Sequence, residues 1–194
     1  MKTREDMNYS QSTYGVMAIL SEGAKSGYEI KKFLSAPELF YWRESYGNIY
    51  PILKRLKANG LVRQIDADVK KKRRIYYQLN DKGREELARW LAKAPVLNRF
   101  RVEMLMKIRF GEMVGVDTIK SNIEHYREMS LLEIDECKEI IDALEHSGDE
   151  SLKTLLRIMT TNYFLRFKEA CFEWCKESIE LLDNWSADNG SGRK

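Results

Sequence analysis

The residues of this sequence best placed to do chemistry are bases and hydrogen-bonding side chains, which suit the binding of a polyanion. Five consecutive bases stand between two segments rich in β-branched and aromatic residues: Lys70, Lys71, Lys72, Arg73 and Arg74. A second group precedes them along the chain: Ser45, Tyr46, Gly47, Asn48, Tyr50, Pro51, Lys54 and Arg55. Lys and Arg neutralise phosphates, and polar side chains on a helix can hydrogen-bond to base edges. DNA is therefore the first partner to consider.

Catalytic constellations are not recognisable. His125 and His146 are isolated, there is no glycine-rich phosphate loop, and no nucleophile stands at a recognisable spacing from a base. We expect no enzyme, no cofactor and no metal site. One alternative stays open, because Cys171 and Cys175 are four residues apart and share a helix face. Thiol redox sensing or soft-metal binding is conceivable there, although two ligands make an incomplete metal site.

The charge of the chain is unevenly distributed. Residues 1–93 hold 19 Lys and Arg against 11 Asp and Glu, whereas residues 94–194 hold 14 against 19. A basic part joined to an acidic one points to a polyanionic partner for the first part alone. The three cysteines are an odd set confined to the second part, which argues for a reducing compartment. With no signal-like segment and no apolar run near the ~18 residues of a membrane span, we expect a cytoplasmic protein without a membrane partner.

Helical periodicity and capping residues predict three helices before the basic run. The first spans 14–22, with Ser10 or Ser12 as its cap, and the second opens at the capping box Ser26–Glu29 and ends at Pro37. The third runs from an N-cap at Ser45 to Asn59, because Gly60 follows in the position where a left-handed backbone ends helices.

The third helix has two distinct faces. Its apolar residues share one face: Ile49, Ile52, Leu53 and Leu56. The opposite face is small or hydrogen-bonding, with Arg55 at its border: Gly47, Tyr50, Pro51, Lys54 and Ala58. Pro51 leaves the Gly47 carbonyl without its helical donor, a defect that water repairs only on an exposed face. This face is therefore expected to point outward.

Two β-prone runs, 61–65 and 75–79, predict a hairpin whose tip, residues 66–74, carries the five bases. A fourth helix follows, capped by Asn80 or Asp81 and carrying Leu87, Trp90 and Leu91. The order of these elements is that of a winged helix-turn-helix with a two-stranded wing, which we assign to residues 1–93 of a mainly α protein.

After Pro95 the pattern is helical only. A short helix over 100–110 ends at Gly111, Asp117 caps a long helix that reaches Leu144, and a last helix runs from Leu152 to Trp185. The apolar stripe of the last helix is wider than one neighbouring helix can cover. We therefore predict an all-α dimerisation domain over 94–185, a homodimer, and a disordered tail over 186–194.

Several segments resemble the PadR family of bacterial transcriptional regulators. They are Gly27–Ile30, the block Tyr41–Leu61 with its Ser-Tyr-Gly-Asn-Ile-Tyr-Pro run, the Tyr-Tyr strand within Arg74–Arg84, and Trp90–Leu91. The stretches 100–111 and 164–175 are similar to the helical dimerisation domain of the family's longer members, a group that includes a virulence activator. One departure matters: the family's wing loop is often rich in glycine, and this one contains none.

The resemblance implies a homodimer that binds a roughly palindromic operator, usually as a repressor released by a small effector, with 45–59 as the recognition helix and 65–76 as the wing. We predict contacts to DNA from the third helix and wing residues named above and from the start of the first helix at Ser10, Ser12 and Tyr14. Tyr46 and Tyr50 could instead pack against the wing or the first helix, and Asn48 suits a phosphate as well as a base. An activator on the same scaffold and a winged helix that binds protein remain alternatives. No effector site is selected by the sequence.

Overall fold

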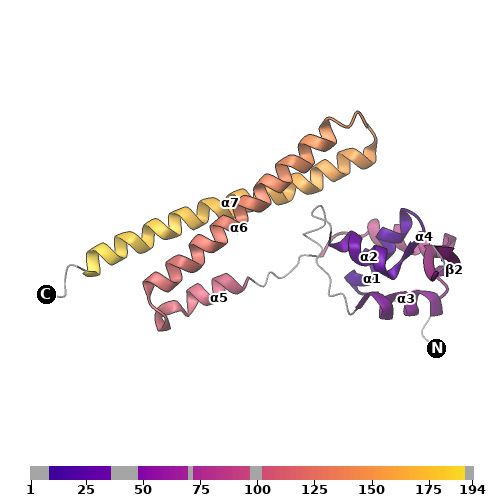
Figure 1. Ribbon diagram of the computed structural model, residues 1–194, viewed down its shortest axis with the longest axis horizontal. Helices are drawn as coiled ribbons and strands as arrows, with labels where there is room; N and C mark the ends of the chain where they lie inside the picture. Colours follow the sequence, from indigo (N-terminus) through magenta and orange to yellow (C-terminus); the bar gives the residue numbers. More distant parts are fainter. Residues whose placement is uncertain (1–8, 36–47, 70–71, 97–101, 191–194) are drawn as a thin grey trace. The chain divides into compact units, whose positions relative to one another are not determined.

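The computed structural model describes residues 9–35, 48–69, 72–96 and 102–190, with the backbone alone at 66–69 and 72–74, and it divides into two compact units, 1–97 and 98–194 (Figure 1). The first unit contains α1 (Gln11–Ser21), β1 (Lys25–Ser26), α2 (Gly27–Leu34), α3 (Ile49–Ala58), β2 (Val62–Val69), β3 (Lys72–Leu79) and α4 (Asp81–Leu91). The second contains α5 (Glu103–Arg109), the 3-10 turn η4 (Gly111–Met113), α6 (Val116–Glu145) and α7 (Leu152–Gly190). The predicted mainly α fold with an N-terminal winged helix-turn-helix is confirmed.

The first two helices begin at the predicted side-chain caps. Ser10, rather than Ser12, caps α1, because its Oγ accepts a hydrogen bond from the Thr13 amide at 3.3 Å. At α2 the Glu29 amide donates to Ser26 Oγ, and the Ser26 amide donates to Glu29 Oε2 at 2.7 Å. This reciprocal pair satisfies two amides that have no partner within the helix.

Helix α3 ends as predicted at Gly60, whose φ is +65°. The Leu61 amide donates to the Leu56 carbonyl and the Gly60 amide to the Lys57 carbonyl, both at 3.0 Å. These are the two bonds of a Schellman motif, which requires a left-handed residue after the helix. The predicted start at Ser45 and the predicted end of α2 at Pro37 lie outside the described residues.

The sheet corrects the predicted wing in two respects. It has three strands in the order β1–β3–β2, because Lys25 and Ser26 pair with Tyr77 and Tyr76. The hairpin strands are also longer than expected, since pairing continues to Val69 opposite Lys72, so residues 66–69 and 72–74 lie in strands rather than in a nine-residue tip. Charged side chains do not end a strand, because its backbone hydrogen bonds to the partner strand do not involve the side chains.

The core of the first unit lies between its helices and β3. Its largest fully buried side chains come from α1, α2 and α3: Tyr14, Met17, Leu20, Ile30, Ile49, Leu53 and Leu56. Helix α4, capped by Asn80 through a 2.9 Å bond from the Gly83 amide, adds Leu87 and stacks Trp90 on Tyr14 with ring centroids 4.8 Å apart. Leu91, by contrast, is exposed.

Helix α6 does not begin at Asp117 as predicted. Its N-cap is Gly115, with φ +81°, and Asp117 lies inside the first turn. Glycine adopts this backbone conformation without steric cost, and an acid in the first turn interacts favourably with the helix dipole. No helix in the described ranges is long and apolar enough to cross a membrane.

Helices α6 and α7 pack side by side along much of their length (Figure 1). Helix α6 buries Ile123, Ser130, Ile134, Cys137 and Leu144, and α7 buries Thr154, Thr161, Leu165, Lys168, Cys175 and Ile179. The α7 residues buried at its centre are therefore partly polar, and most of the predicted apolar stripe lies elsewhere on the helix. The disordered tail predicted for 186–194 is wrong at least to Gly190, because α7 continues to that residue.

We name the exposed apolar residues of α7 the α7 stripe: Leu152, Leu155, Leu156, Met159, Tyr163, Phe167, Leu181 and Trp185. At about 100° per residue they fall within one face of the helix, roughly opposite Thr161, Lys168 and Ile179. Leu152 is 69% exposed and Tyr163 69% exposed. Helix α7 therefore turns a mixed face to α6 and an apolar face to the outside of its unit.

Candidate nucleic-acid interface

The outward face of α3 is where the sequence predicted it. Tyr50, Pro51, Lys54, Arg55 and Ala58 are exposed, and Tyr50 is 64% exposed. The four predicted inward residues are buried, Leu53 and Leu56 completely. Asn48, the residue that precedes α3, is also exposed. Ser45, Tyr46 and Gly47 lie outside the described residues. The helix thus presents a polar, sterically open face anchored by an apolar one.

Arg55 connects this face to the start of α1. Its Nη2 donates to Thr13 Oγ1 at 2.7 Å, and Thr13 Oγ1 lies 2.9 Å from Ser10 Oγ. The structure therefore brings Arg55 and the exposed Ser10 together through Thr13, a residue with no functional signal in the sequence. A buried threonine inside a short apolar helix gives no signal of a charged partner 42 residues away.

Tyr14 belongs to the core rather than to the surface, which corrects its predicted contact with DNA. Its side chain is 2% exposed, and its hydroxyl donates to Glu86 Oε1 at 2.9 Å. Burial, and then the bond to Glu86, raises the pKa of Tyr14 to about 12. The phenol is therefore a neutral donor that ties α1 to α4. Ser12 is half-buried on the same helix.

The wing contributes the basic run at its far end. Lys72, Arg73 and Arg74 lie in β3, opposite Val69, Asp68 and Ala67 of β2. Lys70 and Lys71, which connect the two strands in the sequence, lie outside the described residues. Nearer the core, Lys57 Nζ of α3 donates to Gln64 Oε1 of β2, a contact between helix and wing that was not predicted. The wing is thereby held against the exposed helix.

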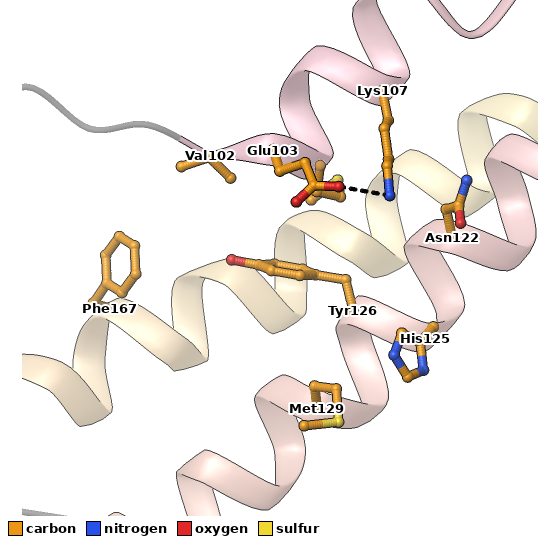
Figure 2. Close-up of a pocket in the computed structure, with 9 residues that line it drawn as sticks. Val102, Glu103, Lys107, Asn122, His125, Tyr126, Met129 and Phe167 are labelled. Atoms are coloured by element: carbon orange, nitrogen blue, oxygen red, sulfur yellow. Dashed lines mark ion pairs between the residues drawn. The ribbon is translucent and has the colours of Figure 1, made fainter. Parts of the chain in front are cut away.

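The second unit contains a pocket of about 520 Å³ between α5, α6 and α7 (Figure 2). Its lining is Val102, Glu103, Met104, Lys107, Asn122, His125, Tyr126, Met129 and Phe167. Tyr126 projects from α6 across the middle of the pocket, between the Glu103–Lys107 ion pair at 2.8 Å and Phe167 (Figure 2). Burial, followed by the repulsion that an ionised phenol would meet from an ionised Cys171, raises the pKa of Tyr126 to about 12. The hydroxyl is therefore a neutral donor, and it donates to Cys171 Sγ at 4.0 Å.

Two of the three cysteines are poorly suited to thiol sensing, and the third, Cys171, is half-buried. Cys137 and Cys175 are fully buried, and burial raises the pKa of Cys137 to about 11 and that of Cys175 in the same direction. A thiol whose pKa is raised is a poor nucleophile at neutral pH, because the thiolate is the reactive form. Across the described parts of the chain, no three His, Cys, Asp or Glu side chains are grouped so as to hold a metal ion.

Each of the two units matches a different family model. Residues 16–89 match the family model described as transcriptional regulator PadR-like family, and residues 100–183 match virulence activator alpha C-term. The negative transcriptional regulator PadR of Bacillus subtilis is 29% identical over 100 residues, which are 50% of this chain and 54% of the relative. The matches span about half the length of the curated relatives.

Solved structures extend the likeness of the fold over nearly the whole chain. The crystal structure of Bacillus subtilis PadR in complex with operator DNA superposes with a TM-score of 0.78 at 18% identity, covering 90% of this chain and 99% of that one. The complex of the same protein with p-coumaric acid gives a TM-score of 0.69 at 19% identity, covering 88% and 98%. With both halves matched by their own models, this chain belongs to the PadR-like family of transcriptional regulators, which are not enzymes, and carries a C-terminal domain of the virulence activator alpha type.

Proposed function

We propose that this chain is a homodimeric regulator that binds operator DNA in a sequence-specific manner and represses transcription until a small effector binds. The observation that carries the proposal is the exposed polar face of α3 beside a basic wing, on a helix whose other face is fixed in the core. A helix exposed in this way can enter the major groove, which distinguishes all four base pairs by their donors and acceptors. The solved complex of the Bacillus subtilis relative with operator DNA supports this placement.

Each group of residues has a separate task in this proposal. Tyr50, Lys54 and the predicted neighbours Tyr46 and Asn48 approach base edges, while Gly47 and Pro51 allow the helix backbone close to the DNA. Ser10, Ser12, Ser45 and Arg55 contact phosphates near the helix ends. The wing bases Lys70, Lys71, Lys72, Arg73 and Arg74 neutralise phosphates or reach the adjacent minor groove, which adds affinity rather than sequence choice.

Lys54→Ala is the test of base reading. The probe is a duplex that the wild-type protein selects from a random library. Removing a hydrogen bond to a base edge should weaken binding to this selected duplex about tenfold more than it weakens binding to an unselected duplex. Fluorescence anisotropy with both duplexes measures the two affinities. Equal reductions on the two duplexes would remove Lys54 from the reading face.

Two variants serve as controls for Lys54→Ala. Lys57→Ala removes the same charge from the same helix at a residue bound to Gln64 of the wing, and it should not alter the preference for the selected duplex. The triple variant Lys71→Ala, Lys72→Ala, Arg73→Ala should reduce the salt dependence by roughly 0.9 in log–log slope for each phosphate that the wing no longer neutralises, while keeping sequence preference.

The pocket around Tyr126 is the proposed effector site. Its lining combines four apolar side chains, Val102, Met104, Met129 and Phe167, with Asn122, His125, the Tyr126 phenol and the Glu103–Lys107 pair. This mixture suits a small planar molecule that carries a polar group. The structure of the Bacillus subtilis relative with p-coumaric acid supports an effector of that size for this chain.

Tyr126→Phe tests the effector site, because it removes the hydroxyl and keeps the ring. With p-coumaric acid as the probe, calorimetry should show binding to the wild-type protein and about tenfold weaker binding to the variant, the effect of removing one hydrogen bond. Tyr28→Phe is the matched control, since Tyr28 is exposed on α2, outside both the pocket lining and the α7 stripe. Binding that both variants leave unchanged would place the probe elsewhere.

A further inference from the structure

Gly27, the first residue of α2, lies against the hydroxyl-bearing edge of the Tyr50 ring. A Cβ atom built on Gly27 would stand 2.7 Å from Tyr50 Cε1, 2.9 Å from Cζ and 3.2 Å from the hydroxyl oxygen. Real side chains do not approach each other so closely. Gly27 is buried although the residue that covers it, Tyr50, is 64% exposed. The ring therefore has one edge against α2 and the remainder in solvent.

Backbone conformation does not explain a glycine at this position. The glycines with a left-handed backbone among the described residues are Gly23, Gly60, Gly115 and Gly148, and Gly27 is not one of them. Alanine is more favourable than glycine in a helix, because glycine loses more conformational freedom on folding. The capping box from Ser26 to Glu29 already starts α2 without any help from Gly27. The remaining explanation is steric: the Tyr50 ring occupies the space that a side chain at position 27 would fill.

We propose that Gly27 is a positioning residue for Tyr50, one that fixes where the phenol hydroxyl stands on the DNA-reading face of α3. The inference rests on the proposed function, because it assigns Tyr50 a contact with DNA. Helices α2 and α3 are the two helices of the helix-turn-helix, and α2 touches α3 through its N-terminal turn at this point. A ring seated on α2 has fewer orientations than a free tyrosine, and binding then costs less side-chain ordering.

Substitution of Gly27 should move the ring and leave the fold intact. The atoms that a new Cβ meets are the far end of the Tyr50 side chain, which is free to swing into solvent, and not backbone. Gly83 is a contrasting case: a Cβ there would stand 2.2 Å from the carbonyl oxygen of Leu61, which cannot move away. Gly27→Ala should therefore change the position of the Tyr50 side chain without changing the stability of the domain.

A double-mutant cycle with the full-length protein tests the inference. The variants are Gly27→Ala, Tyr50→Ala and the two combined, and the probe is a fluorescein-labelled duplex selected by the wild-type protein from a randomised library. We expect Gly27→Ala to weaken binding about tenfold, the effect of removing one hydrogen bond, with a Tm equal to or above that of the wild type. In the Tyr50→Ala background the same substitution should cause no further loss of affinity.

Three results would overturn the inference. The first is that Gly27→Ala binds the selected duplex as tightly as the wild type, and the second is that Gly27→Ala weakens binding by the same factor whether or not Tyr50 is present. The third is that Gly27→Ala lowers the Tm equally with and without Tyr50, which would make Gly27 a packing residue of α2. Each of these leaves the proposed function standing, because the wild-type protein still selects a duplex. Failure to enrich any duplex would instead overturn the proposed function, and this inference with it.

Discussion

Leu156→Glu combined with Met159→Glu should convert the protein from a dimer to a monomer at micromolar concentration. Both residues lie in the α7 stripe and are at least half exposed in the single chain. In the proposed dimer they are buried against the partner, where two carboxylates without partners are strongly unfavourable. Sedimentation equilibrium measures the change of mass directly. Affinity for a palindromic duplex should fall by roughly 100-fold or more, because two linked half-sites become independent.

Lys176→Glu is the matched control for this prediction. It changes the charge of α7 by the same two units, at an exposed position outside the stripe where Lys176 pairs with Glu173. It should leave the dimer and the affinity for the duplex largely unchanged, since exposed ion pairs contribute little. A stripe variant that stays dimeric would show that the chain dimerises through another surface.

Lys168→Ala should destabilise the second unit by about 3 kcal/mol, the lower end of the range for breaking a buried ion pair. Lys168 is 9% exposed, its ammonium pairs with Glu133 of α6, and it lies 5.2 Å and 5.6 Å from the ring centroids of Phe164 and Tyr126. Removing it leaves the Glu133 carboxylate without its cation between two helices. Urea denaturation at one fixed protein concentration measures the change, because the stability of a dimer depends on concentration.

Lys176, on the same helix, is a close comparison for Lys168. It also pairs with an acid, Glu173, and lies 6.0 Å from the Phe172 ring centroid, but about half of its side chain is exposed. Lys176→Ala should cost less than about 1 kcal/mol. The combination Lys168→Met and Glu133→Leu should recover most of the stability that Lys168→Ala removes, since apolar residues of similar size can replace a buried pair. A Lys168→Ala variant as stable as Lys176→Ala would mean that the buried pair contributes nothing.

The local signals of the sequence predicted most of the first unit. The caps at Ser10, Ser26 and Asn80 and the left-handed Gly60 depend on neighbours within a few residues, so their residue types suffice to place them. The two faces of α3 also follow from periodicity, which is why Tyr50 and Lys54 were placed outward correctly. Strand β1 was missed because two residues become a strand only through pairing with Tyr76 and Tyr77, about 50 residues away in the chain.

Contacts between distant segments account for the remaining errors. Periodicity identified an apolar stripe on α7 but not which neighbour it faces, and the structure turns Thr161 and Lys168 to α6 instead. A lysine gives no sequence signal of burial until its partner Glu133 is placed beside it. In the candidate site, the link from Arg55 to Thr13 and the burial of Tyr14 have the same origin, since both depend on how α1 packs against α3 and α4.

The mixed character of the face that α7 turns to α6 has a consequence for how the amount of this regulator is controlled in a cell. Threonines and an ion pair between two helices supply less hydrophobic stabilisation than the apolar α7 stripe on the opposite side. In the proposed dimer, the folded state of the second unit therefore gains much of its stability by mass action from a second copy. If that dimer forms, newly made chains below the dimerisation threshold would be the first that proteases degrade, and a cell that makes little of this protein would retain less of it than synthesis alone predicts.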